Sequence, residues 1–111
     1  MKVEQRGDLA VVRVSLPRLD AAAAPGFRAE MLALVERGRH RMILDLSATE
    51  FLDSIGLGTM VSLLKALGPG GDLAVAGAQP RVRKLFALTR LDRVFRLFET
   101  AEDAERALAA G

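Results

Sequence analysis

The 111-residue sequence contains no cysteine, no tryptophan and no tyrosine, and His40 is its one histidine. The lack of cysteine excludes disulfide bonds, thiolate metal ligands and thiol catalysis. A single histidine is too few for the usual zinc centres, and it argues against a Ser-His-Asp hydrolase. Only five phenylalanines are left to stack on nucleic-acid bases. We therefore expect no metal, no cofactor and no enzymatic activity of the protein's own.

An excess of one charge and long apolar runs are also missing. The chain has 16 basic and 14 acidic residues, a net charge of +2. Lysine, glutamate, arginine and aspartate all occur within residues 1–8, where the apolar core of a signal peptide would begin. No apolar stretch approaches the roughly 20 residues of a membrane span. We expect one domain over residues 1–111, without a membrane span and located in the cytoplasm.

Hydrophobic periodicity predicts alternating strands and helices after an initial hairpin. The predicted strands are residues 2–5, 9–16, 41–46, 72–76 and 96–98. The predicted helices follow Asp20, Asp53, Gln79 and Thr100, the last of these as an N-cap. Residues 47–53 are expected to form a loop. Because parallel neighbours need helical crossovers, this order favours an α/β fold with a mostly parallel sheet.

The most informative stretch runs from a predicted buried strand into a predicted helix. Its residues 53–58 read Asp-Ser-Ile-Gly-Leu-Gly. This order places Ser54 at or beside a helix N-cap, at the carboxyl end of a strand where open α/β sheets hold their sites. Gly56 and Gly58 each weaken a helix by about 1 kcal/mol relative to alanine. A backbone without side chains allows a partner or a neighbouring strand to approach closely.

At these residues the chain resembles the STAS domain family, and in particular the bacterial anti-sigma factor antagonists. The resemblance covers most of the chain and lies in residues 19–21 (LDA), 45–47 (DLS), 51–58 (FLDSIGLG), 71–77 (GDLAVAG) and 88–92 (LTRLD). It implies a single STAS domain: a four- to five-stranded mixed sheet with about four helices, mainly on one side. The family often has a second small or hydroxyl residue where this chain has Ile55.

The resemblance also implies a function in transcription regulation. Such a protein binds an anti-sigma factor that is also a serine kinase, and so frees the sigma factor. The kinase phosphorylates the serine that matches Ser54, which releases the antagonist, and a serine phosphatase resets the cycle. The implied partner-binding residues are Asp20, Asp53, Ser54, Ile55, Gly56, Leu57 and Gly58.

Simpler structural roles stand beside these functional ones. Ser54 and Asp20 could be helix caps, and Asp53 could bind loop N–H groups. Asp45, at a strand end, is expected to bind loop backbone. Ser47 and Thr49 are expected to be turn residues, with a minor phosphorylation site as the alternative.

Two other functions are compatible with the same sequence. Some STAS domains belong to transport ATPase complexes or signalling scaffolds and have no kinase cycle. Alternatively, the basic residues between 81 and 96 could bind nucleic acid or an acidic protein surface. The nucleic-acid alternative lacks interleaved aromatic residues and a recognition-helix pattern.

Overall fold

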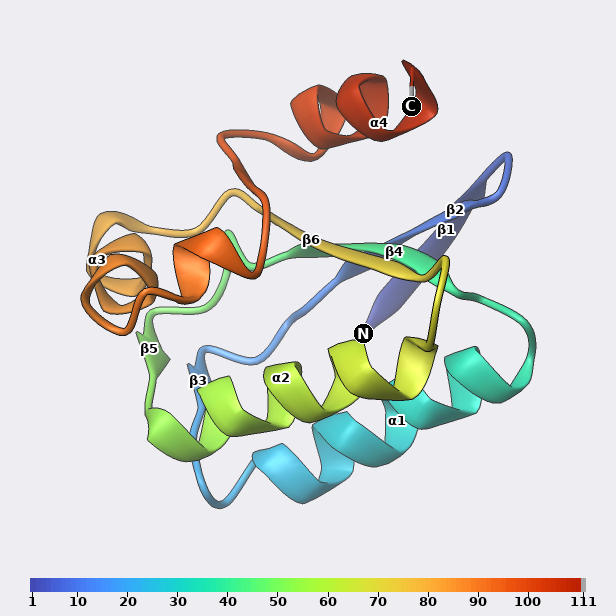
Figure 1. Ribbon diagram of the computed structural model, residues 1–111. Helices are drawn as coiled ribbons and strands as arrows, with labels where there is room; N and C mark the ends of the chain where they lie inside the picture. The colour runs from blue at the N-terminus through green and yellow to red at the C-terminus, as the bar shows by residue number, and fades with distance from the viewer. Residues whose placement is uncertain (111) are drawn as a thin grey trace.

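In the computed structural model, which describes residues 1–110, five strands form one mixed sheet (Figure 1). Its order is β1-β2-β4-β6-β7, with bounds Lys2–Arg6, Leu9–Arg13, Arg41–Asp45, Asp72–Ala76 and Leu97–Phe98. Only β1 runs antiparallel, in a hairpin with β2. Gly7 has a φ of 63° in the two-residue turn of that hairpin, a conformation that glycine adopts without strain. The predicted hairpin is confirmed.

The parallel strand pairs are joined by helical crossovers, as predicted. Helix α1 (Ala24–Glu36) connects β2 to β4, and α2 (Ser54–Leu67) connects β4 to β6. Helix α3 (Pro80–Leu88) and the 3-10 turn η1 (Leu91–Arg93) lead to β7. Within residues 1–110, no helix is long and apolar enough to cross a membrane.

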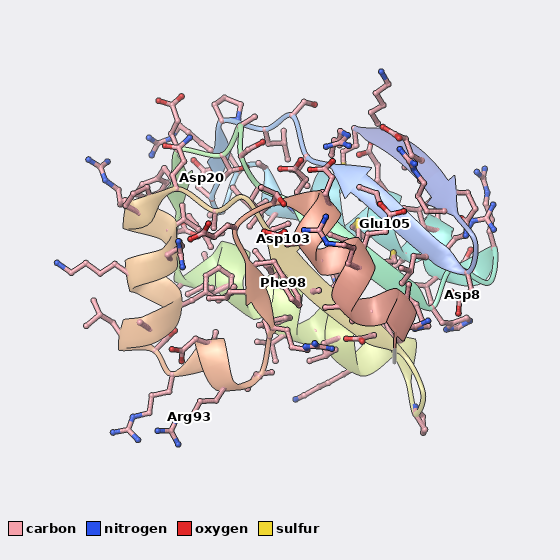
Figure 2. The ribbon with its side chains drawn as sticks, turned by 90° about the horizontal axis from the view of Figure 1, so that it is seen from above. Asp8, Asp20, Arg93, Phe98, Asp103 and Glu105 are labelled. Carbon is pink, nitrogen blue, oxygen red and sulfur yellow. The ribbon has the colours of Figure 1, made fainter. Side chains whose placement is uncertain are left out.

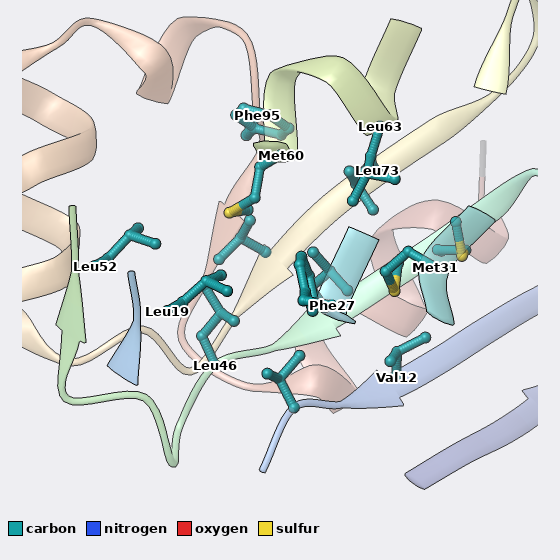
Figure 3. Packing of buried hydrophobic residues seen from close by; sticks show 14 of the residues in the cluster. Val12, Leu19, Phe27, Met31, Leu46, Leu52, Met60, Leu63, Leu73 and Phe95 are labelled. Atoms are coloured by element: carbon teal, nitrogen blue, oxygen red, sulfur yellow. The ribbon is translucent and has the colours of Figure 1, made fainter. Parts of the chain in front are cut away.

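The central strands are buried on both faces, which explains their continuous apolar runs. Side chains alternate between the two faces, as the strand period of two requires. One face packs on α1 and α2 through Ala10, Val12, Met42, Leu44, Leu73 and Val75 (Figure 3). The other face packs on the last helix, α4 (Ala101–Ala110), through Leu9, Val11, Ile43, Ala74 and Ala76. Figure 1 shows α1 and α2 together on one side and α4 alone on the other.

The start of α4 is the predicted one. The Asp103 backbone N–H donates to Thr100 Oγ1 at 3.0 Å, so Thr100 is the cap residue.

A second, two-stranded parallel sheet was not predicted. It pairs β3 (Arg18–Leu19) with β5 (Phe51–Leu52). The predicted strand 9–16 ends earlier, at Arg13. Residues 51–52, which were expected to lie in a loop, form β5 instead. Two-residue strands are too short to show any periodicity in a sequence. Their pairing places Leu19 beside Leu52 and so brings the residues that follow each strand together.

Candidate functional site

Asp53, rather than Ser54, caps helix α2. The Asp53 carboxylate accepts hydrogen bonds from the Ile55 and Gly56 backbone N–H groups at 3.0 and 2.9 Å. Its second oxygen accepts the Ala21 N–H at 3.3 Å. One side chain therefore satisfies two donors at the helix start and fastens that start to the turn after β3. The alternative that Ser54 is the cap is wrong, because Ser54 is the first residue inside the helix.

The residue after the cap is presented to solvent. Ser54 is exposed, and the neighbouring Ile55 side chain is 51% exposed, which is unusual for a large apolar residue. Because the Asp53 carboxylate already accepts the backbone N–H groups at the start of the helix, the Ser54 hydroxyl is not needed as a cap. An exposed hydroxyl at the first turn of a fixed helix is accessible to another protein.

Gly56 and Leu57 face the interior instead. Leu57 is 4% exposed and belongs to the core between the sheet and α2. A Cβ atom on Gly56 would lie 2.3 Å from the Leu19 carbonyl oxygen and 2.7 Å from a Leu52 methyl carbon, far inside contact distance. Glycine is thus required at position 56 because β3 and β5 pass directly beneath the helix. These two residues of the predicted partner-binding set position the site from within the protein.

Gly58 differs from Gly56. It is exposed, and a Cβ atom there would meet nothing within 4 Å. Packing inside the protein therefore does not explain a residue that weakens the helix by about 1 kcal/mol.

Asp20 lies at the turn between β3 and α1. Its carboxylate accepts the Ala23 N–H at 3.1 Å and pairs with the Arg18 guanidinium at 3.4 Å. The Ala23 hydrogen bond, followed by the Arg18 pair, holds the pKa of the Asp20 carboxyl below its ordinary value of 3.8. Asp20 therefore caps the turn before α1 and does not cap the helix itself, which begins after Ala23 without a side-chain cap.

A groove lies beside Ser54, between the first turns of α1 and α2. Its volume is about 320 Å³, and its lining residues are Ala21, Ala24, Pro25, Arg28, Ile55 and Thr59. The walls are mostly apolar, with Arg28 hydrogen-bonded to Ser62 at 3.2 Å. Of the residues that line this groove, only Ile55 was predicted as a site residue. The two sides of the groove belong to α1 and α2, and the sequence does not show that these helices are neighbours.

Other predicted roles at the strand ends are structural. Asp45 pairs with Arg13 at 2.7 Å and accepts the Ser47 N–H at 2.9 Å, which confirms that it binds loop backbone. Thr49 is fully buried, and its hydroxyl donates to the Leu16 carbonyl at 2.8 Å. A phosphorylation site at Thr49 is therefore excluded. Ser47 is exposed, and the site predicted there remains a prediction.

Comparison with known proteins identifies anti-sigma factor antagonists among the curated relatives. RsfB of Mycobacterium tuberculosis, an anti-sigma-F factor antagonist, is 34% identical over 70 residues, or 63% of this chain and 57% of RsfB. The crystal structure of an anti-sigma factor antagonist from Mycobacterium paratuberculosis has a TM-score of 0.87 at 34% identity, covering 96% of this chain and 90% of that one. These names describe antagonists of regulatory factors rather than enzymes.

A more distant neighbour shares the fold alone. It is Bacillus SpoIIAA in its phosphorylated form, with a TM-score of 0.72 at 23% identity, covering 96% of this chain and 97% of SpoIIAA. The chain spans less than two thirds of several curated relatives, 57% of RsfB and 63% of a Thermotoga maritima protein. A family model described as the STAS domain matches residues 1–104, nearly the whole of the strand and helix order above. The protein therefore belongs to the STAS domain family.

Proposed function

We propose that this protein is an anti-sigma factor antagonist whose binding is switched off by phosphorylation of Ser54. Its partner is an anti-sigma factor with serine kinase activity in the cytoplasm, and a serine phosphatase restores the unmodified form. The cycle regulates transcription that depends on the sigma factor. The proposal rests on one observation above all: an exposed Ser54 hydroxyl at the start of α2, beside the exposed Ile55.

The fold can accept a phosphate at Ser54. Phosphorylation adds about 1.5 to 2 negative charges, and the positive end of a helix dipole stabilises an anion by roughly 0.3–1 kcal/mol. Asp53 already occupies the Ile55 and Gly56 N–H groups and lies next to the new charge, so it offsets part of this gain. Since the side chain is exposed, water solvates the phosphate and the folded state is little affected.

A complex cannot accept the phosphate equally well. A partner that covers Ser54 and Ile55 removes water from the phosphate, and a buried charge without a partner costs roughly several kcal/mol. The adjacent Asp53 carboxylate repels the same charge. The effect of phosphorylation therefore falls on binding rather than on folding. SpoIIAA, a protein with the same fold, has a solved structure in its phosphorylated form as well as in its unphosphorylated form, so this fold can carry a phosphate.

The exposed glycine gives independent support for a partner at this surface. Gly58 has open space above it and no role in the core. A partner backbone that lies against the first turns of α2 would require such a bare position. We therefore place Gly58, Ile55 and Ser54 on the contact surface, and the Asp53 cap and the Asp20 turn at its edge.

The test uses the full chain with its cognate anti-sigma factor and ATP. Mass spectrometry should find one phosphate on Ser54, and none in Ser54→Ala. Ser54→Asp should weaken binding to the anti-sigma factor by at least about tenfold while the melting temperature stays nearly unchanged. Ser47→Asp, which adds the same charge at another exposed serine, is the matched control and should bind normally.

Three results would contradict the proposal. Equal affinity of the partner for the parent chain and Ser54→Asp would remove the switch. No phosphate on Ser54 would favour the transport ATPase or scaffold alternative. A phosphate on Ser47 instead would move the switch to another loop.

A further inference from the structure

Helix α3 and the turn that follows it carry a group of exposed basic side chains. The group has six members: Arg81, Arg83, Lys84, Arg90, Arg93 and Arg96. One acid, Asp92, lies among them, and within residues 1–110 none of the six is in an ion pair. Figure 2 shows Arg93 extending from η1 into solvent. We call these residues the basic α3–η1 face.

This face is also apolar and hollowed. The Leu88 side chain is 72% exposed and Val94 is 49% exposed, and these are two of only four large apolar side chains so exposed in residues 1–110. Two hollows lie along α3. One, of about 440 Å³, is lined by Pro80, Arg83, Lys84, Ala87, Asp92 and Leu97. The other, of about 250 Å³, contains Leu88, with Arg81, Lys84, Phe51 and Leu52 in its lining. Apolar residues surrounded by charged ones are typical of a protein interface, whereas a merely solvated face exposes few large apolar groups.

The backbone at Arg90 is a third, independent observation. Arg90 has a φ of 60°, the one positive φ among the non-glycine residues that the structure describes. It follows the end of α3, where its N–H donates to the Ala87 carbonyl at 3.1 Å. Glycine adopts this conformation at helix ends without steric strain, whereas an arginine there costs the fold some stability. Residues held in strained backbone cluster at functional sites, and the Arg90 side chain extends the cations of this face.

The chemistry of the face favours a protein over a nucleic acid. Single-stranded nucleic acids bind through bases stacked on exposed aromatic rings. Here Phe86 and Phe95 are buried against each other, with ring centres 5.8 Å apart. Phe51 and Phe98 are partly buried, and each ring is covered by an arginine, Arg18 and Arg96 respectively. The exposed large apolar residues are aliphatic. Phosphate binding alone would use the cations and would not need Leu88 and Val94 in solvent.

We propose that the basic α3–η1 face docks an acidic segment of a partner protein, whose apolar side chains contact Leu88, Val94 and the hollow beside Arg83. This contact uses other residues than the Ser54 surface and does not depend on the phosphorylation cycle.

The proposal is tested on the full, isotope-labelled chain with short synthetic peptides. The first peptide carries glutamates and leucines at helical spacing, the second has serine in place of leucine, and the third has lysine in place of glutamate. A single-stranded DNA of matched charge is the fourth probe. The first peptide should shift amide NMR signals of residues 80–97, and the other three probes should bind at least about tenfold more weakly.

Charge reversal locates the binding site. The double variant Arg83→Glu with Arg93→Glu should bind the first peptide at least about tenfold more weakly than the parent chain. The control, Lys2→Glu with Arg37→Glu, makes the same change in net charge elsewhere and should bind it normally. The proposal is overturned if no peptide binds, if both double variants bind alike, or if the leucine-free peptide binds as tightly as the first. Tighter binding of DNA would assign the face to nucleic acid. Signal broadening that depends on protein concentration alone would assign it to a second copy of the chain.

Discussion

The two glycines at the start of α2 should respond in opposite directions to the same substitution. Alanine is favoured over glycine in a helix by about 1 kcal/mol. Gly58→Ala adds its methyl group to open space. The free energy of unfolding of this variant should therefore be higher than that of the parent chain by up to about 1 kcal/mol.

Gly56→Ala adds the same methyl group 2.3 Å from the Leu19 carbonyl oxygen. That oxygen belongs to the backbone of β3 and cannot rotate away, so α2 must move from the small sheet. Overpacking of this kind costs about 1–3 kcal/mol, which exceeds the helix gain. We expect Gly56→Ala to be less stable than the parent chain by roughly 1–2 kcal/mol, a gap of about 2–3 kcal/mol between the two variants.

Urea unfolding followed by far-ultraviolet circular dichroism measures both variants. Tryptophan and tyrosine fluorescence cannot serve, because the chain has neither residue. A Gly56→Ala protein as stable as the parent chain would refute the close approach of α2 to β3. Destabilisation of both variants by the same amount would show that the loss lies in the helix and not in the contact.

Three further changes test neighbouring features. Asp53→Ala should lower the free energy of unfolding by about 1 kcal/mol, because the α2 cap is lost; an unchanged urea midpoint would contradict the cap. Arg90→Gly should raise the free energy of unfolding by about 1 kcal/mol and weaken binding of the acidic peptide. A loss of stability would show that the Arg90 backbone is not strained. Asp20→Asn should be less stable than the parent chain near neutral pH. Since folding lowers the pKa of Asp20, its charge stabilises the fold above pH 3.8, and that contribution is lost as the pH falls through the folded value. The difference from Asn should therefore shrink as the pH falls below 3.8, and a constant difference would refute the linkage.

Periodicity within single segments made most of the elements predictable. Strands β4 and β6 are runs of buried residues bounded by polar ones, and α1 repeats its apolar residues at helical spacing. The order of these elements was enough to predict parallel pairing, since parallel neighbours require crossovers. The same local signals predicted a serine at the start of α2 and the Thr100 cap.

The tertiary structure alone decided what surrounds that serine. The pairing of Leu19 with Leu52 joins two segments about thirty residues apart and is too short to leave a pattern in either of them. That pairing makes Gly56 necessary, brings the turn after β3 to the Asp53 cap and opens the groove between α1 and α2. Local sequence determines which face of a helix is apolar, but the neighbour of that face depends on contacts between distant segments. For this reason the Ser54 position could be read from the sequence, whereas the surface around it could not.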